Sequence, residues 1–180
     1  MYHTHFNVAK QQMMGMAGGL IILDPNETGE CPFDYFLMLQ EFAVKGLRMG
    51  ELKQGHFEVE PLSDDLNFFT INGRSFPNTQ RLPVRAGERV RIRMANPSMK
   101  AHPMHLHGHQ FLVVATDGIC INPSAQTLKN TIPVASGETY DVEFVADNPG
   151  NWPFHCHIPH HTANNMTPST GGMFTTLCYV

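Results

Sequence analysis

Several features of common protein classes are missing from this sequence. Its 180 residues hold only four cysteines and no Cys-x-x-Cys pair, which argues against a disulfide-dense scaffold and against a structural zinc site. The 12 Lys and Arg are scattered among 16 Asp and Glu, so the net charge of −4 leaves no basic stripe for nucleic acid. No Gly-x-Ser-x-Gly occurs, which argues against a hydrolase nucleophile elbow.

Long apolar stretches and leader segments are also missing. No purely apolar run approaches the roughly 18 residues that a transmembrane helix needs, so no membrane span is predicted. The first ten residues, MYHTHFNVAK, have neither the charged start nor the apolar core of a signal peptide. No long amphipathic helix is predicted, and residues 7–16 fit a short helix or a loop.

Short apolar segments punctuated by Gly, Pro, Asn and Asp predict an all-β fold. Residues 140–145, YDVEFV, alternate in apolar character as a strand with one buried face does. Short strands with regular turn signals are typical of a sandwich or a barrel. The predicted strands cover residues 19–23, 35–44, 67–71, 89–94, 110–116, 140–145, 153–157 and 173–180.

The polar segment DPNETGECPFD, residues 24–34, is rich in turn formers and is interpreted as a linker. The 23 residues before it are too few to bury a core alone. They either pack on the main domain or belong to a domain of which they are the last part. We therefore divide the chain into residues 1–30, the end of a preceding domain plus a linker, and residues 31–180, a complete β-domain.

Histidine is the residue present in informative excess, with eleven in the chain. Only His56 stands alone in the sequence. The other ten fall into three tight groups: His3 and His5; His102, His105, His107 and His109; and His155, His157, His160 and His161.

The third group surrounds a cysteine, in the stretch NWPFHCHIPHH. Alternate side chains of a strand point to opposite faces, so His155 and His157 share one face and Cys156 takes the other. One strand could therefore serve two metal sites. A thiolate, imidazoles and a long axial thioether form the ligand set of a blue-copper centre, and Cys156, His161 and Met166 supply three of those four ligands locally.

The first two groups supply further imidazoles. His105 and His107 have the spacing that aims two side chains the same way from an extended segment, while His102, before a proline, can turn towards a different site. His3 and His5 repeat the His-x-His spacing. Three such pairs give six imidazoles, which suits a cluster of more than one transition metal.

Other potential ligands are given different roles. Cys31, Cys120 and Cys178 fit one disulfide with a free thiol, or three reduced thiols, equally well. The methionines within residues 13–16 are expected to pack in a core or an interface, with a copper entry path as the alternative. The histidines expected not to bind metal are His56, His109 and His160.

Two motifs resemble those of the multicopper oxidases, laccase-like proteins built from cupredoxin domains. They are HPMHLHGHQF at residues 102–111 and HCHIPHHTANNM at residues 155–166, and both are highly specific. MYHTHF, at residues 1–6, is similar to a shorter segment of that family. The resemblance implies a cupredoxin-like Greek-key β-sandwich or barrel.

The resemblance also implies copper ligands. His102, Cys156 and His161 would bind a type 1 copper, with Met166 in the axial position. The type 2 copper would be bound by His105. Residues implied for the type 3 copper pair are His3, His5, His107, His155 and His157. Cys156 and its two histidine neighbours would link the type 1 copper to the trinuclear cluster and so take part in catalysis.

The activity implied by the family is the one-electron oxidation of a phenol, an aromatic compound or a metal ion such as cuprous ion. That oxidation is coupled to the reduction of dioxygen to water at the trinuclear cluster. A periplasmic or extracellular location is also implied. A copper nitrite reductase is discounted, because there the residue after the type 1 cysteine is not histidine, whereas here it is His157.

One family motif has no counterpart in this sequence. The family uses four His-x-His pairs, and the missing one, His-x-His-Gly, normally lies upstream of the segment that MYHTHF resembles. We therefore expect a truncated chain. Two-domain laccases are similar in assembling their clusters between the subunits of a homotrimer. The alternative function is a non-catalytic blue-copper protein that binds copper and transfers electrons.

Overall fold

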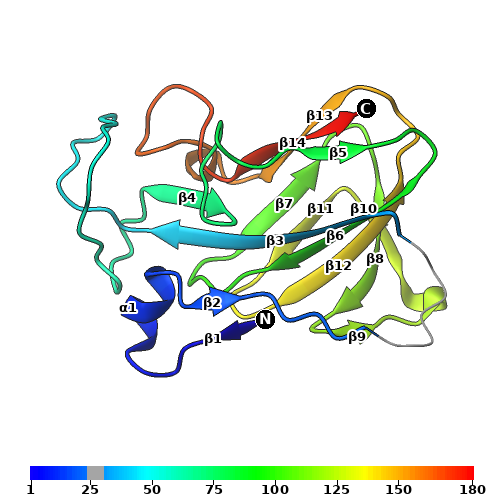
Figure 1. Ribbon diagram of the computed structural model, residues 1–180, viewed down its shortest axis with the longest axis horizontal. Coiled ribbons are helices and arrows are strands. Elements are labelled where there is room, and N and C mark those ends of the chain that lie inside the picture. Colours follow the sequence, from blue (N-terminus) through cyan, green and yellow to red (C-terminus); the bar gives the residue numbers. More distant parts are fainter. Residues whose placement is uncertain (24–30) are drawn as a thin grey trace.

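The computed structural model describes residues 1–23 and 31–180, and its main body is two β-sheets enclosing one hydrophobic core (Figure 1). The first sheet has the order β10 (Thr127–Lys129), β8 (Phe111–Thr116), β12 (Thr139–Val145), β6 (Arg89–Ala95), β3 (Phe33–Phe42) and β4 (Phe68–Ile71), and β9 (Ile119–Cys120) pairs with β8. The second has the order β11 (Thr131–Val134), β7 (His102–Leu106), β13 (Asn151–Cys156), β14 (Phe174–Tyr179) and β5 (Leu82–Val84). This arrangement confirms the predicted all-β sandwich.

Shorter elements complete the described chain. A hairpin-like pair, β1 (Tyr2–His3) and β2 (Ala17–Gly18), encloses the single α-helix of the described residues, α1 (Val8–Met13). Two 3₁₀ helices follow later, η1 (Pro123–Ala125) and η2 (Pro159–Thr162). The short helix expected within residues 7–16 is therefore present, and no helix of the described residues is long and apolar enough to cross a membrane.

The alternation of apolar and polar residues explains why the central strands form. In β6, RVRIRMA, the side chains of Val90, Ile92 and Met94 are buried, while the arginines between them face outward. Arg93 pairs with Asp34 of β3 at 2.8 Å and with Asp141 of β12 at 2.7 Å. Opposite charges on neighbouring strands thus hold the outer face of the first sheet while its inner face packs in the core.

Seven of the eight predicted strands correspond to observed strands, with shifted ends. The strand predicted at residues 19–23 is wrong, since that segment pairs with no strand of the described chain and its Leu and Ile side chains are exposed. Its apolar pattern lacks a partner to supply backbone hydrogen bonds. The predicted linker, residues 24–34, is wrong at its end because β3 begins at Phe33; residues 24–30 lie outside the described part.

The N-terminal segment packs on the main β-domain, which was one of the two alternatives. The Gln12 side chain donates a hydrogen bond to the Pro97 carbonyl, and a Cβ on Gly19 would lie 2.8 Å from the Phe36 ring. The segment nevertheless leaves large apolar side chains at the surface, with Phe6 78% and Ile22 86% exposed. Its packing on this chain therefore covers only part of its apolar surface.

Candidate metal centre

Strand pairing in the second sheet brings together His102, Cys156 and His161. β7 and β13 are antiparallel neighbours with Met104 opposite Cys156, so the start of β7 and the end of β13 lie at the same end of the sheet. The chain then turns through η2, which returns His161 to that end. Their ligand atoms all lie within 4.8 Å of one another, and this is the one group of three or more metal-binding side chains that meets that limit among the described residues.

The geometry of this buried site fits a soft transition metal. His102 Nδ1 lies 3.1 Å from His161 Nδ1, and Cys156 Sγ lies 3.4 Å from the same His161 nitrogen. All three side chains are buried, and the ring of Phe69 stacks on His161 with its centroid 4.0 Å away. Two imidazole nitrogens and one sulfur converging in an apolar setting are the donors that copper prefers.

Burial sets the protonation of these ligands in the metal-free protein. It lowers the pKa of His102 to about 4 and the pKa of His161 to about 3, because a charged imidazolium would be poorly solvated there. It raises the pKa of the Cys156 thiol to about 12 for the same reason. Both imidazoles therefore offer lone pairs at neutral pH, while the thiol must release a proton when a metal binds.

The predicted axial ligand, Met166, does not lie in this buried environment. Its side chain is 54% exposed and its backbone adopts a left-handed φ of 58°. Two other methionines, Met104 and Met173, are fully buried in the same core cluster as Cys156. The described structure thus places buried thioethers beside the cysteine, and they come from positions that the sequence motif does not indicate.

Met173 is tied directly to two of the converging ligands. The Cys156 N–H donates to the Met173 carbonyl at 3.0 Å, and the Met173 N–H donates to the His161 carbonyl at 2.8 Å. His155 is opposite Phe174, so the preceding residue, Met173, projects from the same face as Cys156. In the sequence, the glycine pair before the last strand was the available sign of a tight turn at this place. In the structure, Gly172 has φ +60°, and a Cβ there would lie 2.1 Å from the His161 carbonyl oxygen.

On the other face of β13, four imidazoles form a second group, here called the histidine cluster: His105, His107, His155 and His157. The ring centroid of His105 lies 4.7 Å from that of His107 and 5.2 Å from that of His157. His107 Nε2 lies 2.9 Å from His155 Nε2. Three of the rings are partly buried and His157 is exposed, so the cluster opens to the surface.

Backbone and hydroxyl oxygens orient two rings of the histidine cluster. His105 Nδ1 lies 2.9 Å from the Asn130 carbonyl and 2.7 Å from Thr131 Oγ1, while His155 Nδ1 lies 2.8 Å from the Cys156 carbonyl. An N–H donated to such a carbonyl leaves Nε2 as the lone-pair nitrogen. Burial lowers the pKa of both imidazoles, which favours the neutral form that binds metal.

His3 and His5 are not brought to this cluster within one chain. Their rings lie 4.8 Å from each other, yet no ring contact or hydrogen bond joins them to the other histidines in the described structure. In Figure 1 the β1–β2 pair lies along the lower edge of the molecule, whereas β13 lies along the upper edge. A single chain therefore presents four imidazoles in one place and two in another.

The residues predicted not to bind metal have other surroundings. His109 is 7% exposed, and its Nε2 lies 2.7 Å from the Tyr179 hydroxyl, so it forms part of the packing around β14. His56 and His160 are exposed. All four cysteines are free, so of the two alternatives for Cys31, Cys120 and Cys178 the structure has three reduced thiols.

Comparison with known proteins gives one consistent family. The multicopper oxidase family model matches residues 49–169. The chain is 38% identical over 112 residues to the multicopper oxidase MmcO of Mycobacterium tuberculosis, covering 62% of this chain and 20% of that protein. It is 34% identical over 124 residues to L-ascorbate oxidase of Cucumis sativus, covering 61% of this chain and 21% of that one.

Solved structures agree with these relatives. The blue copper oxidase of Nitrosomonas europaea superposes with a TM-score of 0.66 at 33% identity, over 81% of this chain and 43% of that one. The multicopper oxidase mgLAC gives a TM-score of 0.67 at 32% identity with the same coverage. This chain thus spans about a fifth of the length of the curated relatives it matches.

The β-sandwich and its buried His-Cys-His site define a copper-binding protein of the cupredoxin type. The family model covers well over half of the sequence, and the Mycobacterium tuberculosis relative and the mgLAC structure are both described as multicopper oxidases. The chain belongs to the multicopper oxidase family, and its cofactor is copper.

Proposed function

We propose that this protein is a laccase-like oxidase that oxidises a phenolic, aromatic or metal-ion reductant, cuprous ion included, one electron at a time. The oxidation is coupled to reduction of dioxygen to water. Copper, when bound, supplies both the one-electron acceptor and the oxygen-reducing centre. The observation that carries the proposal is that Cys156 in the buried site and His155 in the histidine cluster are adjacent residues of β13.

We assign ligand roles separately to the buried site and to the histidine cluster. We assign the type 1 copper to His102, Cys156 and His161. As the methionine that would contribute a thioether to this copper we favour Met173 over Met166, because Met173 is fully buried and its backbone is hydrogen-bonded to Cys156 and His161. His105 is assigned to the type 2 copper. The residues assigned to the type 3 pair are His107, His155 and His157, together with His3 and His5.

The backbone of β13 is the shortest covalent connection between the two sites. Adjacent strand residues are separated by only about 3.3 Å along the strand axis and face opposite sides of the sheet. Cys156 thus faces the core, while His155 and His157 take part in the histidine cluster. This separation of faces keeps the buried site apart from the site open to dioxygen.

We further propose that His3 and His5 complete the histidine cluster of a second copy, in a homotrimer with the trinuclear cluster at each subunit interface. The support is the separation of the two imidazole groups within one chain and the exposed apolar side chains of the N-terminal segment. By the family resemblance, we place the protein in the periplasm or outside the cell. The division into residues 1–30 and 31–180 stays a prediction.

A copper-loading experiment tests this function. The purified chain is loaded with copper, and copper per chain is measured together with oxygen uptake on a phenolic dye and on cuprous ion. Oxygen consumption with either reductant is the expected result. A blue protein that consumes no oxygen would instead favour the second candidate, a blue-copper electron-transfer protein, which the buried group of His102, Cys156 and His161 within one chain supports.

A further inference from the structure

A buried carboxylate lies next to the proposed type 1 site without belonging to it. Glu41 is in β3, within the first sheet, and is only 5% exposed. Burial of an ionised carboxylate is costly unless hydrogen bonds or an opposite charge compensate for it. The nearby ammonium of Lys100 lies 2.5 Å from Asp64, so its closest contact is with a different carboxylate.

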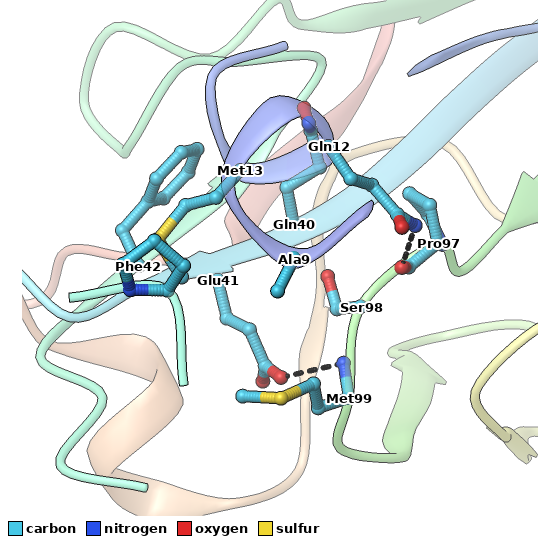
Figure 2. A pocket seen from close by; sticks show the side chains of 10 residues that line it. Ala9, Gln12, Met13, Gln40, Glu41, Phe42, Pro97, Ser98 and Met99 are labelled. Carbon is cyan, nitrogen blue, oxygen red and sulfur yellow. Dashed lines mark hydrogen bonds between the residues drawn. The ribbon is translucent and has the colours of Figure 1, made fainter. Parts of the chain in front are cut away.

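One carboxylate oxygen of Glu41 accepts hydrogen bonds from the backbone of the segment that leads into β7. Glu41 Oε1 accepts hydrogen bonds from the backbone N–H groups of Met99 at 2.9 Å and of Lys100 at 2.8 Å, and Figure 2 shows the first of these. Both donors lie within three residues of His102. Glu41 therefore fixes the segment from which this ligand projects.

The other carboxylate oxygen points at the ligand itself. Glu41 Oε2 lies 3.5 Å from His102 Nε2, and the two side chains are 2% and 0% exposed. Within the described part of the chain, these two atoms are buried and neither has a hydrogen-bond partner. A carboxylate oxygen accepts only, whereas a ring nitrogen that carries a proton donates, so the two atoms are complementary.

We propose that Glu41 is a positioning residue of the type 1 site: Oε2 accepts the His102 Nε2–H and so turns the Nδ1 lone pair towards Cys156 and His161. The inference rests on the proposed function for the metal, but the hydrogen bond itself is a property of the protein alone. A neutral imidazole carries one N–H, so fixing that proton on Nε2 leaves Nδ1 free to bind metal.

Burial keeps water away from the contact between Glu41 and His102, whose side chains are 2% and 0% exposed. Ala9, Gln12 and Met13 of α1 line the same cavity as Glu41, as Figure 2 shows. A hydrogen bond kept away from water in this way is stronger than an exposed one. A carboxylate partner also makes a ligating imidazole more basic, which favours cupric over cuprous ion and lowers the reduction potential.

The first test compares two variants that each lose one buried carboxylate. Copper-loaded Glu41→Gln is expected to keep its copper and its blue band while its midpoint potential becomes more positive than that of the wild type. Glu143→Gln is the matched control, because Glu143 is 9% exposed and pairs with Arg89 and Arg91 rather than with a ligand. Equal potentials in Glu41→Gln and wild type, or equal shifts in the two variants, would overturn the proposal.

Folding failure of Glu41→Gln does not end the test. Glu41→Asp keeps the charge but shortens the side chain by one methylene group, so it is expected to weaken the contact and to shift the potential in the same direction. An unchanged potential in a folded Glu41→Asp, with Glu41→Gln unfolded, counts against the proposal.

The second test needs no copper and separates this inference from the proposed function. In metal-free wild-type protein labelled with ¹⁵N-histidine, the ring nitrogen shifts of His102 at neutral pH are expected to show the Nε2–H tautomer. The Nδ1–H tautomer would overturn the role of Glu41 whatever the protein does with copper. A wild-type chain that shows this tautomer but takes up no blue copper would sink the proposed function and leave the hydrogen bond in place.

Discussion

At the scale of single residues, the Cys156 thiol is the feature on which the type 1 assignment depends. Cys156→Ser is expected to remove the blue band almost completely and to lower copper per chain, because the thiolate is the strongest soft ligand in the set. Visible absorption and a copper assay measure both effects. Cys120→Ser is the control, since Cys120 is exposed and free. A blue Cys156→Ser variant would refute the assignment.

The choice of axial thioether is a second question at the residue scale. Met173→Leu is expected to keep the blue band but to raise the midpoint potential, because a weakly donating thioether is removed from beside the copper. Met166→Leu should leave the potential unchanged, since Met166 is half exposed. Voltammetry of the two variants decides between them. A raised potential in Met166→Leu alone would return the axial role to the position that the motif predicts.

The position of Glu41 beside His102 could not be predicted from the sequence. A single Glu within the apolar stretch FLMLQEF gives no hint of its partner, because that partner, His102, is brought near only by the packing of one sheet on the other. Met173 was also difficult to predict, since the glycine pair before it indicates a tight turn but not its partners. The ligand role that we propose for Met173 depends on the register of β14 against β13, which residue spacing does not report.

At the scale of elements, the turn into β14 controls the buried site. Gly172→Ala is expected to destabilise the protein and to impair type 1 copper binding, because the new Cβ would lie 2.1 Å from the His161 carbonyl oxygen at a φ of +60°. Gly118→Ala is the matched control: its φ is +78°, but nothing lies within 4 Å of the new Cβ.

Comparing Gly172→Ala with Gly118→Ala separates the effect of backbone strain from the effect of steric crowding around the new Cβ. Gly118→Ala should lose about 1–2 kcal/mol of unfolding free energy, the usual cost of a left-handed conformation for a residue with a Cβ. Gly172→Ala should lose more and should also lose blue absorbance. Denaturant unfolding and copper titration measure the two effects, and equal behaviour of the variants would show that the close approach to His161 has no influence on the site.

Strand prediction succeeded where length and alternation agreed. β6 and β12 each run for seven residues and alternate in apolar and polar residue types over most of their length, and the sequence located both within one residue. β5, β10 and β11 are three or four residues long, two of them with a proline, and were missed. β7 was missed because HPMHL has polar histidines where a strand pattern expects apolar or neutral residues.

At the scale of the whole molecule, the separated imidazole groups predict an effect of the N-terminal segment on copper content. The double variant His3→Ala/His5→Ala is expected to bind less copper per chain while its blue band stays at the wild-type level, because the buried site contains neither residue. Copper assays and light scattering with and without copper measure content and oligomeric state. His56→Ala, which removes an exposed lone histidine, is the control.

Two results would contradict the intersubunit arrangement. Wild-type protein that remains a monomer with full copper loading would show that a second copy is not needed. A loss of blue absorbance in His3→Ala/His5→Ala would show that the N-terminal histidines act on the type 1 site, which the described contacts do not support.

The sequence by itself determined which metal-binding side chains this protein places on each face of one strand, because a cysteine between two histidines must send the thiol and the imidazoles to opposite faces. It also determined the all-β class, since alternating apolar segments between turn formers have few other ways to bury one face. Only the tertiary structure decided that Met104 and Met173 are buried in the core with Cys156, that Glu41 faces His102, and that His3 and His5 stand apart from the other imidazoles. These contacts join residues distant in sequence, and their distances depend on strand register and sheet packing rather than on spacing along the chain.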